Sequence, residues 1–204
     1  MPVSWMLQPE WTALIENASD SHKKYLHLAA ISFAERKLDG AEIYCKKALE
    51  YNRSSAALFV MAQICRLKED NEAAAEYSLE AYKLRPEDIS LAREMMLLHL
   101  TAEQYETMIK VYENAPQCIK NDGRVTMYYS FALLRSGNTE AADRILNADG
   151  GICVDDIREG EITITDLYLE IEEAKAKAAG VHFSRGNADV PRKFDFRMFV
   201  EKKD

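Results

Sequence analysis

This sequence contains few of the residues that form disulfides, metal clusters or tight turns. Among its 204 residues are four Cys, four His, eight Gly, five Pro and two Trp. The low Gly and Pro content excludes a collagen-like chain, and a 48% hydrophobic content argues against disorder. No stretch reaches the roughly 18 uninterrupted apolar residues of a membrane-spanning helix. The first residues lack the basic and apolar regions of a signal peptide. We expect one folded domain with an appendage and no membrane segment.

The cysteines and histidines are too scattered to indicate a metal or redox site. There is no CxxC pair and no HExxH motif, so we expect no metal ligand set. Cys45 and Cys65 fall within apolar helical patterns, where a free cysteine behaves as a small buried hydrophobe. A chain with reduced thiols fits the cytosol, and we expect a cytoplasmic location.

The charge and the missing motifs exclude several functions. An excess of acidic residues gives a net charge of −8, whereas general nucleic-acid binders carry a basic surface. The sequence has no Walker A loop, no GxGxxG turn and no GxSxG elbow. We therefore expect no nucleic-acid partner, no cofactor and no enzymatic activity.

Three columns of small or apolar residues repeat every 33 or 34 positions. They comprise Ala29, Ala62, Met96 and Ser130; then Ala41, Ala74, Met108 and Ala142; and finally Ala48, Ala81 and Ala115. Antiparallel helices need small side chains where their backbones approach most closely, with larger apolar residues alongside. Units of this kind cannot bury their apolar faces alone, so they stack. The pattern predicts a solenoid of helical hairpins.

On these residues the sequence resembles the tetratricopeptide-repeat (TPR) family, whose unit is 34 residues long. The resemblance implies an all-α solenoid with four units, at residues 22–54, 55–88, 89–122 and 123–149. The first two match well, whereas Met96 and Met108 stand at small-residue columns of the third. The fourth keeps Gly137 at its turn but has Asp149 where Ala is usual. Residues 1–21 are expected to form an N-terminal capping helix, centred on 9–18.

Polar residues mark several predicted helix starts. Residues 39–42 and 101–104 have the spacing of capping boxes. Asn71, Asp88 and Asn138 are expected to cap the helices that follow them.

In TPR proteins the first helix of each unit lines a concave groove that binds peptides, and the resemblance implies the same here. From the positions that line such a groove, we select as partner-binding candidates Phe33, Phe59, Gln63, Arg66, Arg93, Leu97, Met127 and Phe131. Arg124 is a further cation at such a position. The aromatic residues could instead pack between repeats. Leu26, Ala30, Ser90 and Glu94 stand where chaperone-tail binders have Lys or Asn, so we expect no binding of acidic EEVD-type tails.

The last third of the chain departs from the repeat. Residues 150–183 are expected to form an acidic linker followed by a capping helix that opens at residues 163–166 and stops at Gly180. Residues 184–204 form an extended tail with a charge of +2, which leaves −10 for the rest. A free tail would not normally expose Phe194, Phe196 and Met198, so we expect these residues to dock, either on this chain or on a partner. The tail could thereby gate the groove.

This last third also resembles the C-terminal end of large bacterial TPR proteins that carry a mutarotase-like β-sandwich domain of unassigned function. The similarity rests on residues 156–161, 190–191 and 194–198. It implies a bacterial, carbohydrate-related context, and this chain would then be a fragment or a stand-alone relative. Two functions therefore remain open: a scaffold that binds a protein or peptide partner, and an accessory region of a carbohydrate-active or carbohydrate-binding protein. Self-association is compatible with either.

Overall fold

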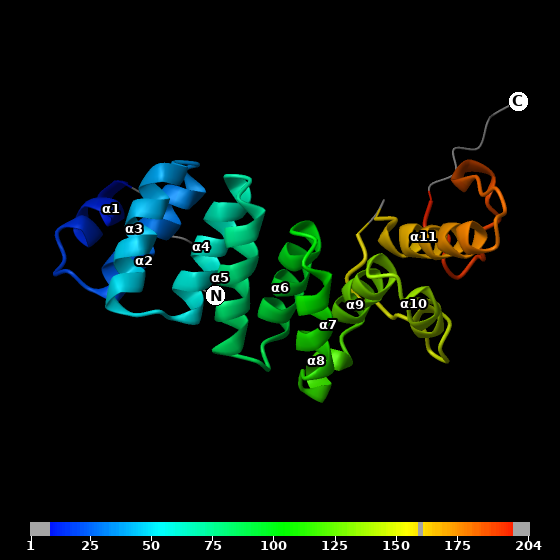
Figure 1. Cartoon of the computed structure of the whole chain (residues 1–204). Helices are drawn as coiled ribbons and strands as arrows, with labels where there is room; N and C mark the ends of the chain where they lie inside the picture. Colours follow the sequence, from blue (N-terminus) through cyan, green and yellow to red (C-terminus); the bar gives the residue numbers. More distant parts are fainter. Residues whose placement is uncertain (1–8, 159–160, 198–204) are drawn as a thin grey trace, which may run out of the picture. The chain divides into compact units, whose positions relative to one another are not determined.

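The computed structural model describes residues 9–158 and 161–197, which divide into two compact units at residues 102 and 103. Unit 1 contains α1 (Pro9–Glu16), α2 (His22–Ala34), α3 (Leu38–Tyr51), α4 (Ser55–Leu67), α5 (Asn71–Lys83) and α6 (Ile89–Thr101) (Figure 1). Unit 2 contains α7 (Tyr105–Glu113), α8 (Gln117–Lys120), α9 (Gly123–Arg135), α10 (Thr139–Leu146) and α11 (Thr163–Ala178), then a 3₁₀ turn at Arg185–Asn187. The described residues include no strand, so the predicted all-α class is confirmed.

Within each unit, consecutive helices pack as the repeat requires. The hairpins α2–α3 and α4–α5 join through α3–α4 and α5–α6 contacts, and α9 packs on α10 in unit 2. The residues of the first two columns are at most 1% exposed, and those of the third at most 9%. Ala62, Ala74 and Leu98 form one cluster where α4, α5 and α6 meet. The repeat period therefore marks the places where helices approach most closely.

The turns between paired helices repeat with the same period. Arg36, Glu69, Glu103 and Gly137 all have φ between 56° and 91°. In three of these turns the next amide donates to a carbonyl five residues earlier, as from Asp70 to Cys65 at 3.0 Å. This bond is the mark of a Schellman ending, which normally has Gly at the left-handed position. Three of the four turns place a larger side chain there.

Several predicted helix starts were wrong by one or more residues. α3 begins at Leu38 with Lys37 as its N-cap, so Asp39 lies inside the first turn. Thr101 is the last residue of α6, and α7 starts at Tyr105. Asp70, not Asn71, caps α5 by accepting from the amide of Ala73. In each case the left-handed turn fixes where the next helix starts, and that turn is not marked by Gly in the sequence.

Other boundaries agree with the sequence. Asp88 and Asn138 cap α6 and α10 through their side chains, and Gly180 follows the end of α11 with φ of 68°.

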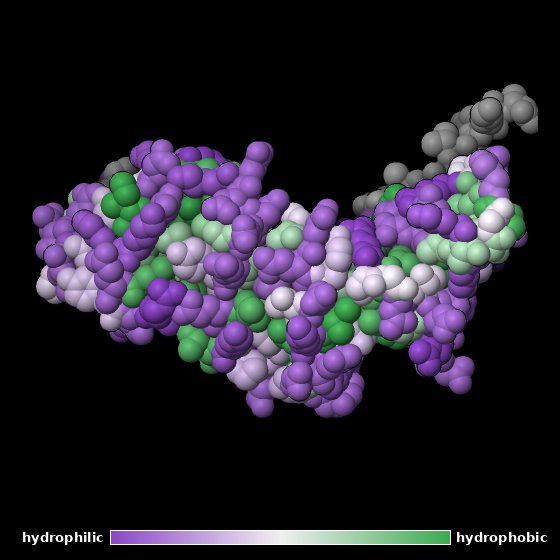
Figure 2. Space-filling view, viewed as in Figure 1, coloured by the Kyte–Doolittle hydropathy of each residue, from purple (hydrophilic) through white to green (hydrophobic). Residues whose placement is uncertain are grey.

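The face shown in Figure 2 carries mostly hydrophilic side chains with separate apolar patches between them. In the described part of the chain, no helix is both long and apolar enough to cross a membrane.

Candidate functional site

In unit 1, the predicted groove residues lie on α2 and α4, the first helices of their hairpins, and on α6. Phe33, Phe59 and Leu97 are half-buried, between the fully buried column residues and the solvent. Arg66 is exposed. Phe59 and Arg66 lie four residues before and three residues after Gln63, so all three share one face of α4. This face and the matching faces of α2 and α6 form the candidate site.

A hydrogen bond between neighbouring helices orients this surface. The Gln63 side chain is 8% exposed, and its Nε2 donates to Oε1 of Glu94 on α6 at 2.6 Å. The bond directs the Phe59–Arg66 face of α4 towards the part of α6 that carries Arg93 and Leu97. Gln63 therefore links α4 to α6. The Gln63 amide is therefore largely inaccessible to a binding partner.

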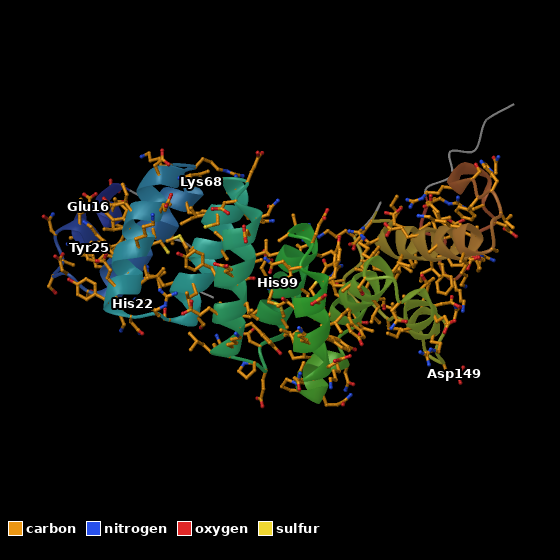
Figure 3. The ribbon with its side chains drawn as sticks, in the orientation of Figure 1. Glu16, His22, Tyr25, Lys68, His99 and Asp149 are labelled. Carbon is orange, nitrogen blue, oxygen red and sulfur yellow. The ribbon has the colours of Figure 1, made fainter. Side chains whose placement is uncertain are left out.

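The opposite end of α2 is held by aromatic and polar contacts to α3 and α4, near the labelled His22 and Tyr25 in Figure 3. The Tyr25 ring stacks with those of Tyr44 and Tyr51, at centroid distances of 6.5 and 5.8 Å. One ring nitrogen of His22 lies 3.0 Å from the carbonyl of Ala48, and the other lies 3.0 Å from Oγ of Ser54. These contacts attach α2 to α3 and to the N-cap of α4.

In unit 2, two predicted partner-binding residues prove inaccessible. Met127 is 0% and Phe131 3% exposed, because α9 is packed against α7, α10 and α11. The Arg135 guanidinium lies 5.3 Å from the Phe131 ring centroid and pairs with Glu170 of α11. The assignment of Met127 and Phe131 to partner contact is thus corrected: both belong to the core of unit 2. For Phe131 the alternative expectation, that the aromatic residues pack between helices instead of contacting a partner, is the one that holds.

Arg124, at the start of α9, is also engaged by the chain itself. Its guanidinium pairs with Asp156 at 3.0 Å and with Glu161 at 2.7 Å. The hydrogen bond from Arg124 lowers the pKa of the Glu161 carboxyl, and the same bond raises the pKa of Arg124. The acidic linker that follows α10 therefore supplies the anions for this cation.

Part of the C-terminal tail lies against α11. Phe194 is 5% exposed, and its ring stacks on Tyr168 with a centroid distance of 5.4 Å. The buried Thr165 hydroxyl donates to the Phe194 carbonyl at 2.6 Å and accepts from the Phe196 amide at 3.0 Å. Phe196 itself is 38% exposed, and Met198 lies outside the described residues. Sequence reasoning missed Thr165, because nothing local to it signals a bond to a residue 29 positions away.

The described residues offer no cluster of three or more His, Cys, Asp or Glu able to hold a metal ion. All four cysteines are free, and burial raises the pKa of the Cys45 thiol to about 12. This thiol donates to the Ala57 carbonyl at 3.2 Å, so Cys45 serves the packing of α3 on α4.

Comparison with known proteins identifies the fold. No protein-family model matches the sequence, and no curated protein matches it. Among solved structures, YrrB, described as a TPR protein with an unusual peptide-binding site, aligns with a TM-score of 0.62 and 18% identity over 85% of each chain. The chain has the tetratricopeptide-repeat fold.

Two further structures have the same fold at lower TM-scores. MamA aligns with a TM-score of 0.55 and 13% identity, covering 83% of this chain and 87% of MamA. PilF from Pseudomonas aeruginosa aligns with a TM-score of 0.53 and 19% identity, covering 78% of this chain and 72% of PilF. These TPR-fold neighbours lend no support to the resemblance between the last third of the chain and mutarotase-associated proteins.

Proposed function

We propose that this TPR chain is a protein-interaction scaffold whose α2–α4–α6 face binds a peptide segment of a partner. The observation that carries the proposal is the shared, half-buried state of Phe33, Phe59 and Leu97 on three successive first helices. Complete burial of a side chain of this size is favourable by about 1.5–3 kcal/mol. A bound segment that covers the exposed part of these side chains would therefore gain part of that free energy on binding. The peptide-binding site described for YrrB supports the same assignment.

The chemistry of this face favours a segment with apolar anchors and one acidic group. Two of its helices offer partly exposed apolar rings, and Arg66 is exposed at the end of the α4 row. An apolar side chain inserted beside Phe59 would lie about one helical turn from Gln63, and a carboxylate beyond it can pair with Arg66. Recognition would thus combine apolar burial with one charge-assisted hydrogen bond.

A peptide-display selection on the whole chain tests this proposal. The affinity of selected peptides is measured by fluorescence anisotropy for the unmodified chain and for Phe59→Ala, Arg66→Ala and Ile43→Ala. Ile43 is a matched control, because it is 57% exposed on α3, outside the proposed face. We expect at least tenfold weaker binding for Phe59→Ala, about 1.4 kcal/mol, and no more than a twofold change for Ile43→Ala.

Arg66→Ala separates binding from folding, because this side chain is exposed and its removal leaves no cavity. The Arg66 variant should keep the melting temperature and lose affinity. Selected peptides that respond to Ile43→Ala and ignore both groove variants would contradict the proposal. The absence of catalysis, the cytoplasmic location, self-association and the absence of nucleic-acid binding stay predictions from the sequence.

A further inference from the structure

In unit 2, Arg124 holds a segment of the same chain in the manner of a bound peptide. Its Nε donates to Oδ1 of Asp156 at 3.0 Å, and its Nη2 donates to the Asp156 main-chain oxygen at 3.1 Å. Nη1 and Nη2 donate to the two carboxylate oxygens of Glu161 at 2.7 and 3.2 Å. The Arg124 side chain is only 14% exposed. A forked pairing of this kind is both strong and geometrically selective.

The main chain of the same segment lies directly on the first residue of α9. An ideal Cβ built on Gly123 would lie 1.6 Å from the carbonyl oxygen of Cys153 and 2.4 Å from its carbonyl carbon. No side chain other than hydrogen fits at position 123 while the segment is in place. Gly123 and Arg124 therefore act together: Gly123 admits the close approach of another main chain, and Arg124 binds the carboxylates of that segment.

Residues 152–158 of this segment are half-buried at Ile152, Val154 and Ile157 and otherwise exposed. Residues 152–154 have no regular secondary structure, and the segment follows Gly150 and Gly151, which have φ of 87° and 56°. Cys153, Asp155 and Arg158 are exposed, and Asp156 retains 50% of its side-chain surface. A segment without helix or strand, whose carboxylates meet one arginine, can be exchanged for another of the same chemistry.

We propose that the Gly123–Arg124 surface of α9 is a binding site for an acidic peptide of another protein, and that residues 152–158 with Glu161 occupy it from within the chain. A partner must therefore displace the resident segment. An intramolecular ligand competes at a high effective concentration, so the site binds weakly until the resident segment is released. This site lies in unit 2 and is independent of the α2–α4–α6 face of unit 1.

The test uses the full chain and a fluorescein-labelled peptide with the sequence of residues 150–162. Asp156→Asn combined with Glu161→Gln weakens the resident segment by removing its charges while keeping the size of its side chains. We expect the peptide to bind this double variant at least tenfold more tightly than the unmodified chain. Adding Arg124→Gln should abolish the gain. A peptide with Asn and Gln at the two acidic positions should not bind.

Two controls separate this proposal from its alternatives. Glu80→Gln neutralises an exposed ion pair with Arg53 in unit 1 and should leave peptide binding unchanged. Phe59→Ala should also leave it unchanged, so the outcome does not depend on the function proposed for unit 1. A double variant that binds no more tightly overturns the proposal. So does a gain that survives Arg124→Gln, or a double variant that dimerises and ignores the peptide.

Glu161 also contacts the Thr163 hydroxyl at the start of α11, so the double variant could lose stability. A second measurement therefore uses the unmodified chain. An excess of the peptide should speed amide hydrogen exchange within residues 152–158, because those residues leave the surface when the peptide binds. Unchanged exchange at saturating peptide would contradict displacement.

Discussion

Glu69 has the backbone conformation that Gly137 has at the equivalent place of the last repeat. Its φ is 63°, a region that costs a residue with a Cβ about 1–2 kcal/mol. We expect Glu69→Gly to raise the free energy of unfolding by up to about 1 kcal/mol, since greater freedom in the unfolded chain offsets part of the relief. Urea unfolding measures the change.

The matched control is the same substitution within a helix. Glu76 is exposed in the middle of α5, where Gly has no conformational advantage. Glu76→Gly should therefore lower the free energy of unfolding by about 1 kcal/mol. Equal losses at positions 69 and 76 would show that the left-handed turn stores no strain.

His99 lies on α6 with a side chain that is 1% exposed (Figure 3). Its Nδ1 lies 2.9 Å from the Met95 carbonyl, and its Nε2 has no hydrogen-bond partner among the described residues. Burial lowers the pKa of this imidazole below its ordinary 6.5, and Lys83 adds to the shift. The folded state therefore disfavours the charged form, so the stability contribution of neutral His99 is complete above pH 6.5 and is lost progressively below it.

Chemical unfolding between pH 7.5 and 5.5 measures this effect above the range in which carboxylates titrate. The unmodified chain should lose stability as the pH falls through that interval, and His99→Leu should flatten the dependence. The control is His27→Leu, at an exposed position of α2. If the slope persists in His99→Leu, another group causes it.

At the scale of helices, the periodic part of the fold follows from the sequence. Ala41, Ala74 and Ala142 are small at fixed intervals because each lies where two helices touch. Helices that are adjacent in the sequence pack on each other, so their contact residues recur as a pattern that the sequence shows. Helix starts were harder to predict. Residues 39–42 have the spacing of a capping box, but the turn at Arg36 starts α3 two residues earlier than the box requires.

The site in unit 2 was not predictable, because it depends on contacts between distant segments. Arg124 has the position and charge of a groove residue, and only the path of residues 153–161 reveals its pairing with Asp156 and Glu161. Likewise, Met127 and Phe131 have an amphipathic spacing that suits either a groove or a core. The packing of α11 on α9 decides between them. Gly123, directly before Arg124, was a usable signal, since glycine permits the close approach of another main chain.

The attachment of the tail to α11 depends on one buried hydroxyl. Thr165 is 0% exposed and bonds both the Phe194 carbonyl and the Phe196 amide. Thr165→Val keeps the shape but leaves these two backbone groups without their partner, at a cost of about 1–3 kcal/mol. We expect a lower melting temperature, faster amide exchange at Phe196 and more binding of an apolar dye.

Thr101→Val is the control for this change, because the Thr101 hydroxyl is exposed and bonds the Leu97 carbonyl of its own helix. Thr101→Val should leave amide hydrogen exchange at Phe196 unaltered. Removal of residues 184–204 should increase dye binding as Thr165→Val does, since it uncovers Tyr168. If neither change alters dye binding or melting, the contact with α11 adds nothing to stability.

At the scale of the whole molecule, the two compact units predict separate unfolding transitions. Stability in repeat proteins is a sum of local terms and neighbour contacts, so a long array need not unfold as one cooperative body. The sequence provides a selective probe. Its two tryptophans, Trp5 and Trp11, both precede residue 102, so tryptophan fluorescence reports on unit 1, whereas circular dichroism reports on the helices of both units.

Gly123→Ala and Glu69→Gly can therefore be followed independently. A Cβ at position 123 collides with the Cys153 carbonyl, and we expect this clash to outweigh the roughly 1 kcal/mol that Ala gains over Gly in a helix. Gly123→Ala should thus lower the circular-dichroism midpoint and leave the fluorescence midpoint in place. Glu69→Gly should raise the fluorescence midpoint, because Glu69 and Trp11 belong to unit 1. Both probes shifting together in both variants would show that the units unfold as one, since a change in either would then be felt by every helix.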